Sequence, residues 1–242
     1  MLASAAAIYG ATASPAFGLA SVELDGLNFT NEAAVEARLA VTEGANLFTL
    51  ATGPLEARIA ALPTVADARV AVRLPDTLTV TITEHEPILV WRVGGRDLLL
   101  GGDGILFAQV GEDPPPGAAS LPVIEDRRAA SVSLGVGWQL APVDFDAATR
   151  LGSLRPVEVG SRAGALSVVV TDDQGYVVSG GPDGWTAIFG FYTPSLRTPD
   201  IIPGQVRLLR SLLSGREAEV ERVILASETD GTYIPKPSPP AP

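Results

Sequence analysis

The sequence contains no cysteine, one histidine and one methionine among its 242 residues. Without cysteine the chain can form neither a disulfide scaffold nor a cysteine-based zinc site, and it has no thiol nucleophile. Basic residues are also few, since 17 lysines and arginines stand against 28 aspartates and glutamates, a formal net charge of −11. Affinity for nucleic acid comes mostly from Lys and Arg on phosphates, and a membrane-surface patch needs a basic cluster. The charge balance therefore argues against both kinds of partner.

Residues that could carry acid–base chemistry are equally scarce. Any Ser-His-Asp triad would have to use His85, which lies between two glutamates at the end of a predicted strand, where a solvated histidine is the simpler interpretation. Asp144 and Asp146 could form a carboxylate pair. So could Asp172 and Asp173. Both pairs fall in turn-like sequence, which favours solvated turn residues over glycosidase or metal chemistry.

Two further patterns have simple structural interpretations. The glycine-rich run Gly101–Gly104 is not a phosphate loop, because it lacks the lysine and precedes a strand instead of a helix. An aromatic cluster near residue 190 could line a groove, but aromatic residues in a short strand more often belong to the core. Its members are Trp185, Phe189, Phe191 and Tyr192. The sequence thus predicts no catalytic residues, no cofactor and no metal site.

A helix followed by a hairpin is predicted between residues 52 and 84. Leu55, Ile59 and Leu62 recur at the spacing of one helical face, with Thr52 as a possible cap and Pro63 as the stop. Two arms with period-two alternation follow, joined by a Pro-Asp turn. Their apolar positions are Val70, Val72 and Leu74 on the first arm and Leu78, Val80 and Ile82 on the second.

The preceding residues complete a small unit. Ser21–Leu24 alternates like a short strand, and Thr30 or Asn31 can cap a helix that Gly44 ends. The predicted order is β-α-α-β-β over about seventy residues, and two helices on one face of a three-stranded sheet can bury a small core.

Several pieces of this unit, taken in register, resemble the POTRA domain of the FtsQ family of bacterial cell-division proteins, called DivIB in Gram-positive bacteria. His85 departs from the family pattern, which usually has an arginine at that place. The matching pieces are Val22–Gly26, Gly44–Phe48, Leu62–Val70, Leu74–Leu78 and Glu84–Pro87.

The rest of the chain fits the same family, and the resemblance spans roughly residues 14–235. It contains short alternating segments, a Leu-Pro-Val-Ile element at 121–124, a weak helix over 147–154 and a late helix from Ile202. The predicted fold class is α+β, a POTRA domain followed by a sheet-rich α+β domain. The predicted divisions are a membrane segment at 1–15, the POTRA domain at 16–88, an FtsQ-type β domain at 89–235 and a Pro-rich tail at 236–242.

The amino terminus needs its own interpretation, because residues 1–22 carry no charge. A span needs about twenty apolar residues, but this run is rich in Ala, Ser and Gly and is interrupted by Pro15. A signal peptide would start with basic residues, which are missing, and a disordered tail is a further alternative. We favour the C-terminal part of a transmembrane helix over residues 1–15, because the family's single membrane span meets its POTRA domain near Pro15.

The resemblance implies a non-enzymatic divisome scaffold that links early and late division proteins and regulates septal peptidoglycan synthesis. Such a protein is anchored in the cell membrane by one N-terminal helix, has its bulk outside the cytoplasm at the septum, and recruits small bitopic proteins of the FtsB/FtsL type and other divisome components. The alternative is a POTRA protein of outer-membrane assembly or secretion. Such proteins usually carry tandem POTRA units and many barrel strands.

The last predicted strand, Gly231–Ile234, is followed only by Pro-rich sequence, so we expect it to form a sheet edge that can accept a strand from another chain. In the family the partner's strand adds to this last edge, so the resemblance implies contacts on Thr232, Tyr233 and Ile234. Alternatively, Tyr233 and Ile234 close the core and the prolines only blunt the edge.

Overall fold

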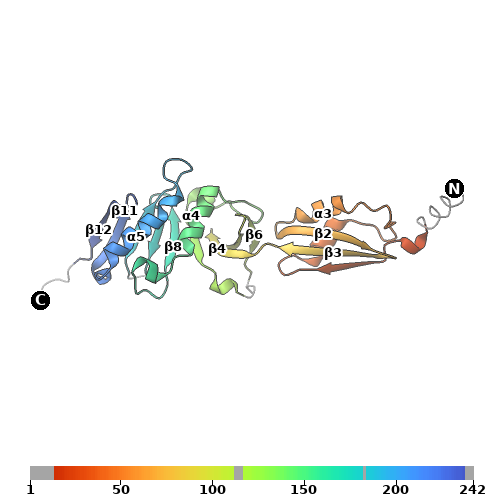
Figure 1. Cartoon of the computed structure of the whole chain (residues 1–242), viewed down its shortest axis with the longest axis horizontal. Helices are drawn as coiled ribbons and strands as arrows, with labels where there is room; N and C mark the ends of the chain where they lie inside the picture. The colour runs from red at the N-terminus through yellow and green to blue at the C-terminus, as the bar shows by residue number, and fades with distance from the viewer. Residues whose placement is uncertain (1–13, 112–116, 182–183, 238–242) are drawn as a thin grey trace. The chain divides into compact units, whose positions relative to one another are not determined.

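The computed structural model describes residues 14–111, 117–181 and 184–237. They pack into two compact units, one ending at Glu86 and one beginning at Pro87 (Figure 1). Of the predicted membrane segment at 1–15, residues 1–13 lie outside the described residues, as does most of the tail at 236–242. Within the described ranges, no helix has the length and hydropathy that crossing a membrane requires.

The first unit has the predicted β-α-α-β-β order. Its three-stranded sheet has the order β1-β3-β2, with β1 parallel and β2 antiparallel to the central β3. A 3-10 helix precedes β1. The elements are η1 (Pro15–Phe17), β1 (Ser21–Asp25), α2 (Glu32–Leu39), α3 (Gly53–Ala60), β2 (Val65–Arg73) and β3 (Thr77–Glu84).

The helix boundaries show which local signals operate. Asn31 caps α2, since its side chain accepts a hydrogen bond from the Ala33 N–H at 2.8 Å. The predicted end at Gly44 is wrong, because α2 stops at Leu39 and Ala40 adopts a left-handed conformation with φ of 47°. A left-handed residue ends a helix whatever its identity, and here an alanine takes the role usually given to glycine.

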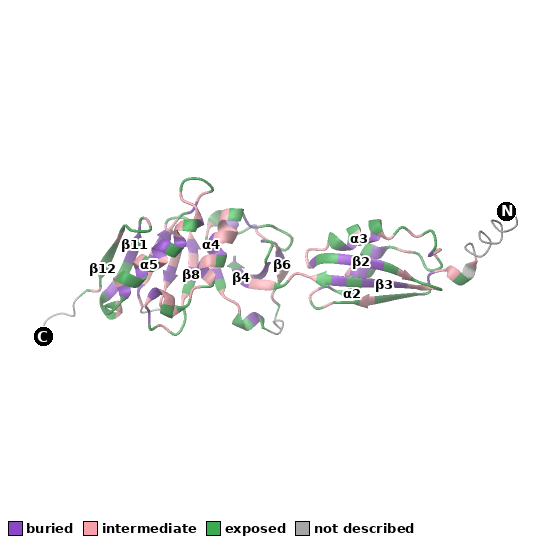
Figure 2. Ribbon diagram, viewed as in Figure 1, coloured by how far each residue is buried: buried purple, intermediate pink, exposed green. Residues whose placement is uncertain are grey.

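The core of the first unit lies between the two helices and the sheet (Figure 2). Each arm of the hairpin presents its alternate apolar residues to the helices, as period two requires. Leu74 is an exception, because it lies at the hairpin tip and is 47% exposed. The buried core residues are Leu19, Val35, Leu39, Leu47, Leu55, Ile59, Val65, Ala68, Val70, Leu78, Val80 and Ile82.

The described residues of the second unit form a nine-stranded mixed sheet with two longer helices, so the α+β fold class is confirmed. Its sheet order is β12-β11-β10-β9-β8-β7-β4-β5-β6. The strands are β4 (Pro87–Val93), β5 (Arg96–Gly101), β6 (Leu106–Gln109), β7 (Val123–Asp126), β8 (Ser167–Thr171), β9 (Gly175–Ser179), β10 (Thr186–Gly190), β11 (Val220–Leu225) and β12 (Gly231–Pro235). The helices are η2 (Ala118–Ser120), η3 (Ala129–Ser131), α4 (Pro142–Gly152), η4 (Pro156–Val159), η5 (Pro199–Ile201), α5 (Ile202–Leu213) and η6 (Glu217–Glu219).

The two helices α4 and α5 cover one face of this sheet and bury its core (Figures 1 and 2). Neighbouring strands are parallel at β4–β7, β7–β8 and β10–β11 and antiparallel elsewhere. Alternation along β8 shows the division of faces, since Val168 and Val170 are buried while Val169 between them is only half-buried. The helix predicted at 147–154 begins earlier, at Pro142, because proline fits the first turn of a helix.

Candidate partner-binding edge

The hairpin of β11 and β12 ends the described sheet. Val220, Val223 and Leu225 are buried in the core, and they fix β11 beside β10. A tight loop then reverses the chain, because the Ser227 hydroxyl oxygen accepts hydrogen bonds from the N–H groups of the second and third residues after it, at 3.2 and 2.9 Å. The loop positions β12 antiparallel to β11.

In the described sheet β12 pairs only with β11, so it forms the edge that the sequence predicts. Thr232, Tyr233 and Ile234 are all exposed, with Tyr233 at 40% and Ile234 at 39%. The alternative in which Tyr233 and Ile234 close the core does not hold.

The backbone of β12 alternates between the two sides of the strand. The Lys236 N–H donates to the carbonyl oxygen of Glu219, the residue directly before β11, at 2.7 Å, so the backbone N–H of Lys236 turns toward the β11 side. The register irregularity of this pair lies in β11, so β12 itself keeps a regular period of two. We infer that Ile234 and Thr232 also turn their backbone groups toward β11. Tyr233, between them, then presents its N–H and C=O to the open side.

The side chains alternate as well. Tyr233 lies opposite the buried Val223, so its ring is on the helix-covered face, with the Arg216 guanidinium 5.7 Å from the ring centroid. Thr232 and Ile234 lie opposite Ile224 and Arg222 and are on the other face. The edge therefore offers a cationic and aromatic face and a mainly aliphatic face to any strand that pairs with it.

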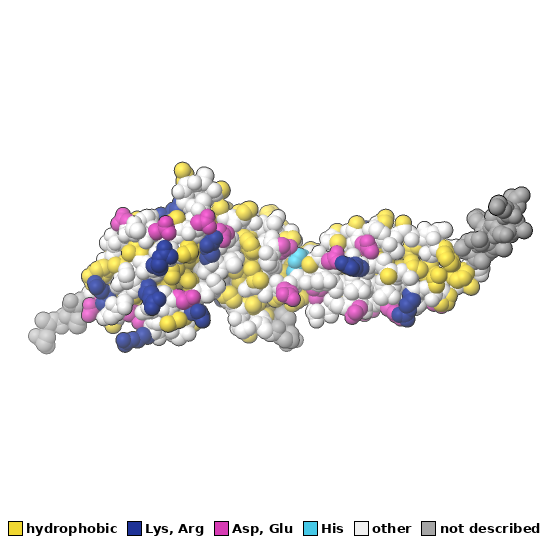
Figure 3. All heavy atoms as spheres, in the orientation of Figure 1, with side chains coloured by type: hydrophobic (Ala, Val, Ile, Leu, Met, Phe, Trp, Pro, Cys, Tyr) yellow, Lys and Arg dark blue, Asp and Glu magenta, His cyan; other side chains and the backbone are white. Residues whose placement is uncertain are grey.

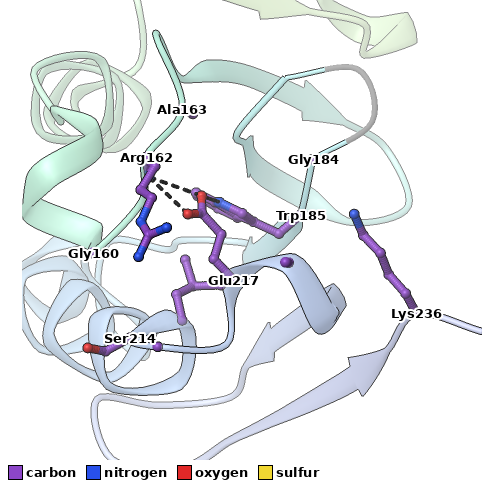
Figure 4. A pocket seen from close by; sticks show the side chains of 11 residues that line it. Gly160, Arg162, Ala163, Gly184, Trp185, Ser214, Glu217 and Lys236 are labelled. Atoms are coloured by element: carbon purple, nitrogen blue, oxygen red, sulfur yellow. Dashed lines mark hydrogen bonds between the residues drawn. The ribbon is translucent and has the colours of Figure 1, made fainter. Parts of the chain in front are cut away.

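A hollow of about 550 Å³ adjoins the end of β12, because Lys236 lines it. Glu217 accepts hydrogen bonds there from the Arg162 N–H at 2.9 Å and from Trp185 Nε1 at 3.0 Å, and also from the Ser161 hydroxyl. Figure 4 shows Arg162 on one side of Glu217 and Lys236 on the other. Burial opposes ionisation of Glu217, but these hydrogen bonds outweigh it and hold its pKa below the ordinary value.

This hollow could not be predicted from the sequence. Arg162 and Glu217 are 55 positions apart, and a single charged residue in a loop is usually solvated. Trp185 was predicted as part of an aromatic cluster, and it is buried in the core together with Phe189 and Tyr192. Phe191, the remaining member of the cluster, is 50% exposed.

The carboxylate pairs have separate structural roles. The interpretation of Asp144 and Asp146 as turn residues is wrong, because both lie in α4. Asp144 forms an ion pair with Arg128 at 3.0 Å and accepts a hydrogen bond from the Tyr176 hydroxyl at 2.9 Å. Burial opposes the charge of Arg128, but the carboxylates of Asp126 and Asp144 outweigh it and raise the pKa of Arg128 above its ordinary value.

The remaining candidates lie in turns or at strand ends. Asp172 and Asp173 are exposed in the β8–β9 turn, as predicted, and Asp172 accepts a hydrogen bond from the Ala129 N–H at 2.8 Å. His85 follows β3, and its N–H donates to the Thr64 carbonyl oxygen at 3.1 Å. In the described ranges of the chain, no three His, Cys, Asp or Glu residues come together in a group that could hold a metal ion.

Comparison with known proteins shows what parts of the chain are similar to. Residues 17–85 match the family model described as POTRA domain, FtsQ-type. Three curated relatives are each named Cell division protein FtsQ. The protein from Mycobacteroides abscessus is 32% identical over 110 residues, 46% of this chain and 35% of its own length. The relative from Novosphingobium aromaticivorans is 33% identical over 105 residues, 43% of this chain and 33% of its own length. That from Chloroflexus aggregans is 30% identical over 124 residues, 49% of this chain and 44% of its own length.

The chain spans less than half the length of the curated relatives that it matches. The match over residues 17–85 coincides with the β-α-α-β-β unit. The first unit is thus similar to a POTRA domain of the FtsQ type, and nearly half of the chain is similar to proteins named Cell division protein FtsQ.

Proposed function

We propose that the chain is a non-enzymatic scaffold of the division machinery. In this role it links early and late division proteins and regulates septal peptidoglycan synthesis through protein–protein contacts. The names of its relatives support a part in cell division. The FtsQ-type description of the matched domain favours this role over the alternative of outer-membrane assembly or secretion.

The proposed partners are small bitopic proteins of the FtsB/FtsL type, and the proposed contact is strand addition to β12. The observation that carries this proposal is the open edge at Thr232, Tyr233 and Ile234, three consecutive exposed residues in the last strand of the described sheet. Unpaired backbone groups on a sheet edge are a template for another strand. The hollow lined by Arg162 and Lys236 offers cationic groups for an acidic side chain of the same partner.

We further propose that residues 1–15 belong to a membrane anchor, that 16–88 and 89–235 are the two domains and 236–242 a Pro-rich tail, and that the protein acts at the septum. The two compact units support the domain division, since each has its own buried core. The uncharged sequence of residues 1–22 supports the anchor.

Proline scanning of the edge tests the proposed contact. Tyr233→Pro removes the one N–H that we infer to face outward at the centre of β12, and proline is tolerated on an edge strand where its N–H would face solvent. Tyr233→Ala is the matched control, because it removes the side chain and keeps the N–H. We expect the dissociation constant of an FtsB-type peptide to be at least about tenfold higher for Tyr233→Pro than for Tyr233→Ala. The proline loses one hydrogen bond to the added strand and interrupts the pairing along it.

Circular dichroism and the unfolding midpoint check that both variants keep their fold, so that a loss of binding is not a loss of structure. A chain that ends at Asp230 lacks the edge altogether and should give no binding, while the hairpin of the first unit stays folded. Unchanged binding by the Tyr233→Pro variant and by the shortened chain would remove the edge as the contact.

A further inference from the structure

One end of the first unit is apolar and exposed. We call it the apolar end and define it by Phe17, Phe48 and Leu74. Phe48 is 46% exposed and Leu74 is 47% exposed. The rings of Phe17 and Phe48 pack edge to face with their centroids 4.7 Å apart. An aromatic pair that stays partly exposed to solvent marks a surface that another apolar phase can cover.

The fold brings these residues to the same end. The Phe17 carbonyl oxygen accepts a hydrogen bond from the Leu47 N–H at 3.0 Å, which holds the two aromatic segments together. The Ala20 N–H donates to the Asp76 carbonyl oxygen at 2.9 Å, which ties the same segment to the β2–β3 turn beside Leu74. Figure 1 shows the tip of this hairpin at the end of the first unit where η1 lies. Figure 3 shows hydrophobic side chains gathered over that end.

The charge of the segments that build this end favours an uncharged phase. Among residues 14–20, 41–50 and 74–77 the charged residues are Glu43 and Asp76, both acidic. An anionic surface would repel them, whereas the zwitterionic interface of a bilayer would not. The sequence that precedes this end also favours lipid, since residues 1–13 carry no charge and ten of them are Ala, Ile, Leu, Met or Tyr.

We propose that the apolar end seats in the headgroup region of a zwitterionic bilayer and so orients the first unit on the membrane surface. The proposal rests on the proposed anchor at residues 1–15, but it adds a direct lipid contact by the folded domain. Side chains that insert at the boundary between headgroups and acyl chains bind in proportion to the apolar area they bury. Burying half of the exposed surface of one phenylalanine in the bilayer should change the partition of the protein between water and membrane by about fivefold.

The absence of cysteine makes the test direct, because any introduced thiol is the single labelling site. The full chain is reconstituted in phosphatidylcholine vesicles with an environment-sensitive fluorophore at one position at a time. Phe48→Cys reports on the apolar end, and Ile8→Cys reports on the proposed anchor. Asn28→Cys is the matched control, because it is an exposed residue whose N–H donates to Glu84, at the other end of β3.

We expect lipids that carry a nitroxide near the headgroup to quench the fluorophore at positions 8 and 48 and not at position 28. Quenching at position 8 without quenching at position 48 would overturn the seating of the apolar end and leave the anchor intact. No quenching at either position would overturn the anchor and the seating together. The two failures are therefore distinguishable.

A charge placed in the apolar end supplies the second arm. Leu74→Asp in the Phe48→Cys background should reduce quenching at position 48 about fivefold, because the carboxylate resists transfer out of water. Leu196→Asp is its matched control, since Leu196 is 93% exposed and lies in the second unit. Equal quenching in the two charged variants would also overturn the proposal. Circular dichroism confirms that the labelled and charged variants keep their fold.

Discussion

At the scale of single residues, Glu84 shows what sequence patterns can and cannot reveal. The sequence predicts it as the last residue of a strand, beside the one histidine. The structure gives its carboxylate three backbone donors, the N–H groups of Asn28, Phe29 and Thr30, at 2.9, 2.8 and 2.6 Å. Those donors belong to the loop before α2, more than 50 positions away in sequence. Alternation predicts a strand end, but it has no means of predicting a partner so distant.

Glu84 should make the first unit sensitive to acid. Burial raises the pKa of Glu84, but the hydrogen bonds of residues 28–30 outweigh it and hold the pKa below the ordinary value. A carboxyl whose pKa is lowered in the folded state stabilises fully above its unfolded pKa of about 4.3, and this contribution is lost as the pH falls through the folded pKa. Glu84→Gln should lower the free energy of unfolding at pH 7 by about 1–2 kcal/mol.

The measurement is denaturant unfolding of the first unit at pH 7 and at about pH 3. We expect the difference in unfolding free energy between the wild-type protein and Glu84→Gln to narrow at the lower pH, because the carboxyl is then largely protonated in the unfolded chain and must lose its proton to keep these hydrogen bonds. Glu86→Gln is the matched control, since Glu86 is an exposed neighbour. If the difference in unfolding free energy were the same at both pH values, the charge of Glu84 would play no part in stability.

At the scale of elements, most strands and both principal helices of each unit follow from local pattern. Period two predicts β2 and β3, and the apolar spacing after a Thr-x-Pro start predicts α3. The parallel pairings β4–β7, β7–β8 and β10–β11 could not be predicted, because they depend on which buried faces fit together across intervening segments. The end of α2 was mispredicted because an alanine, instead of the glycine, takes the left-handed conformation.

Gln205 illustrates a contact that only the assembled elements define. It is fully buried in α5, and its side chain accepts from the Tyr192 hydroxyl at 2.7 Å and donates to the carbonyl oxygens of Phe189 and Leu225 at 3.1 Å each. It therefore joins α5 to the ends of β10 and β11. The sequence of this helix alone predicts an amphipathic segment with a glutamine on its apolar face, and it does not predict the hydrogen-bond partners of that glutamine.

Gln205→Leu should destabilise the second unit by about 1–3 kcal/mol, because the buried Tyr192 hydroxyl then lacks its acceptor. The unfolding midpoint in urea measures the change. Ser211→Ala, at an exposed position of the same helix, should stay within about 0.5 kcal/mol of the wild-type protein. A loss smaller than that of the Ser211→Ala control would mean that Tyr192 finds another acceptor.

At the scale of the whole molecule, the described chain has two separate cores. One extends from Leu19 to Ile82 and the other from Leu89 to Leu225, and no residue belongs to both. The sequence predicts this division because the β-α-α-β-β pattern is complete before Pro87 and a new set of strands begins there. The edge at β12 was also predicted, and in the described sheet β12 pairs with β11 alone. The sequence does not predict the hollow beside that edge, whose lining comes from four separate segments of the second unit.

The separation of the cores leads to a prediction about the proposed partner contact. Because Tyr233, the hollow and their supporting core all lie in the second unit, residues 87–242 alone should fold and bind an FtsB-type peptide. Sites that share no partner contribute independently, to within about 0.5 kcal/mol, so the dissociation constant should stay within about twofold of that of the full chain. Isothermal titration of both forms with the same peptide measures this. A tenfold weaker affinity of residues 87–242 would instead place part of the peptide's contacts in the first unit. In that case the Tyr233→Pro variant of the full chain would still bind the peptide weakly through the first unit.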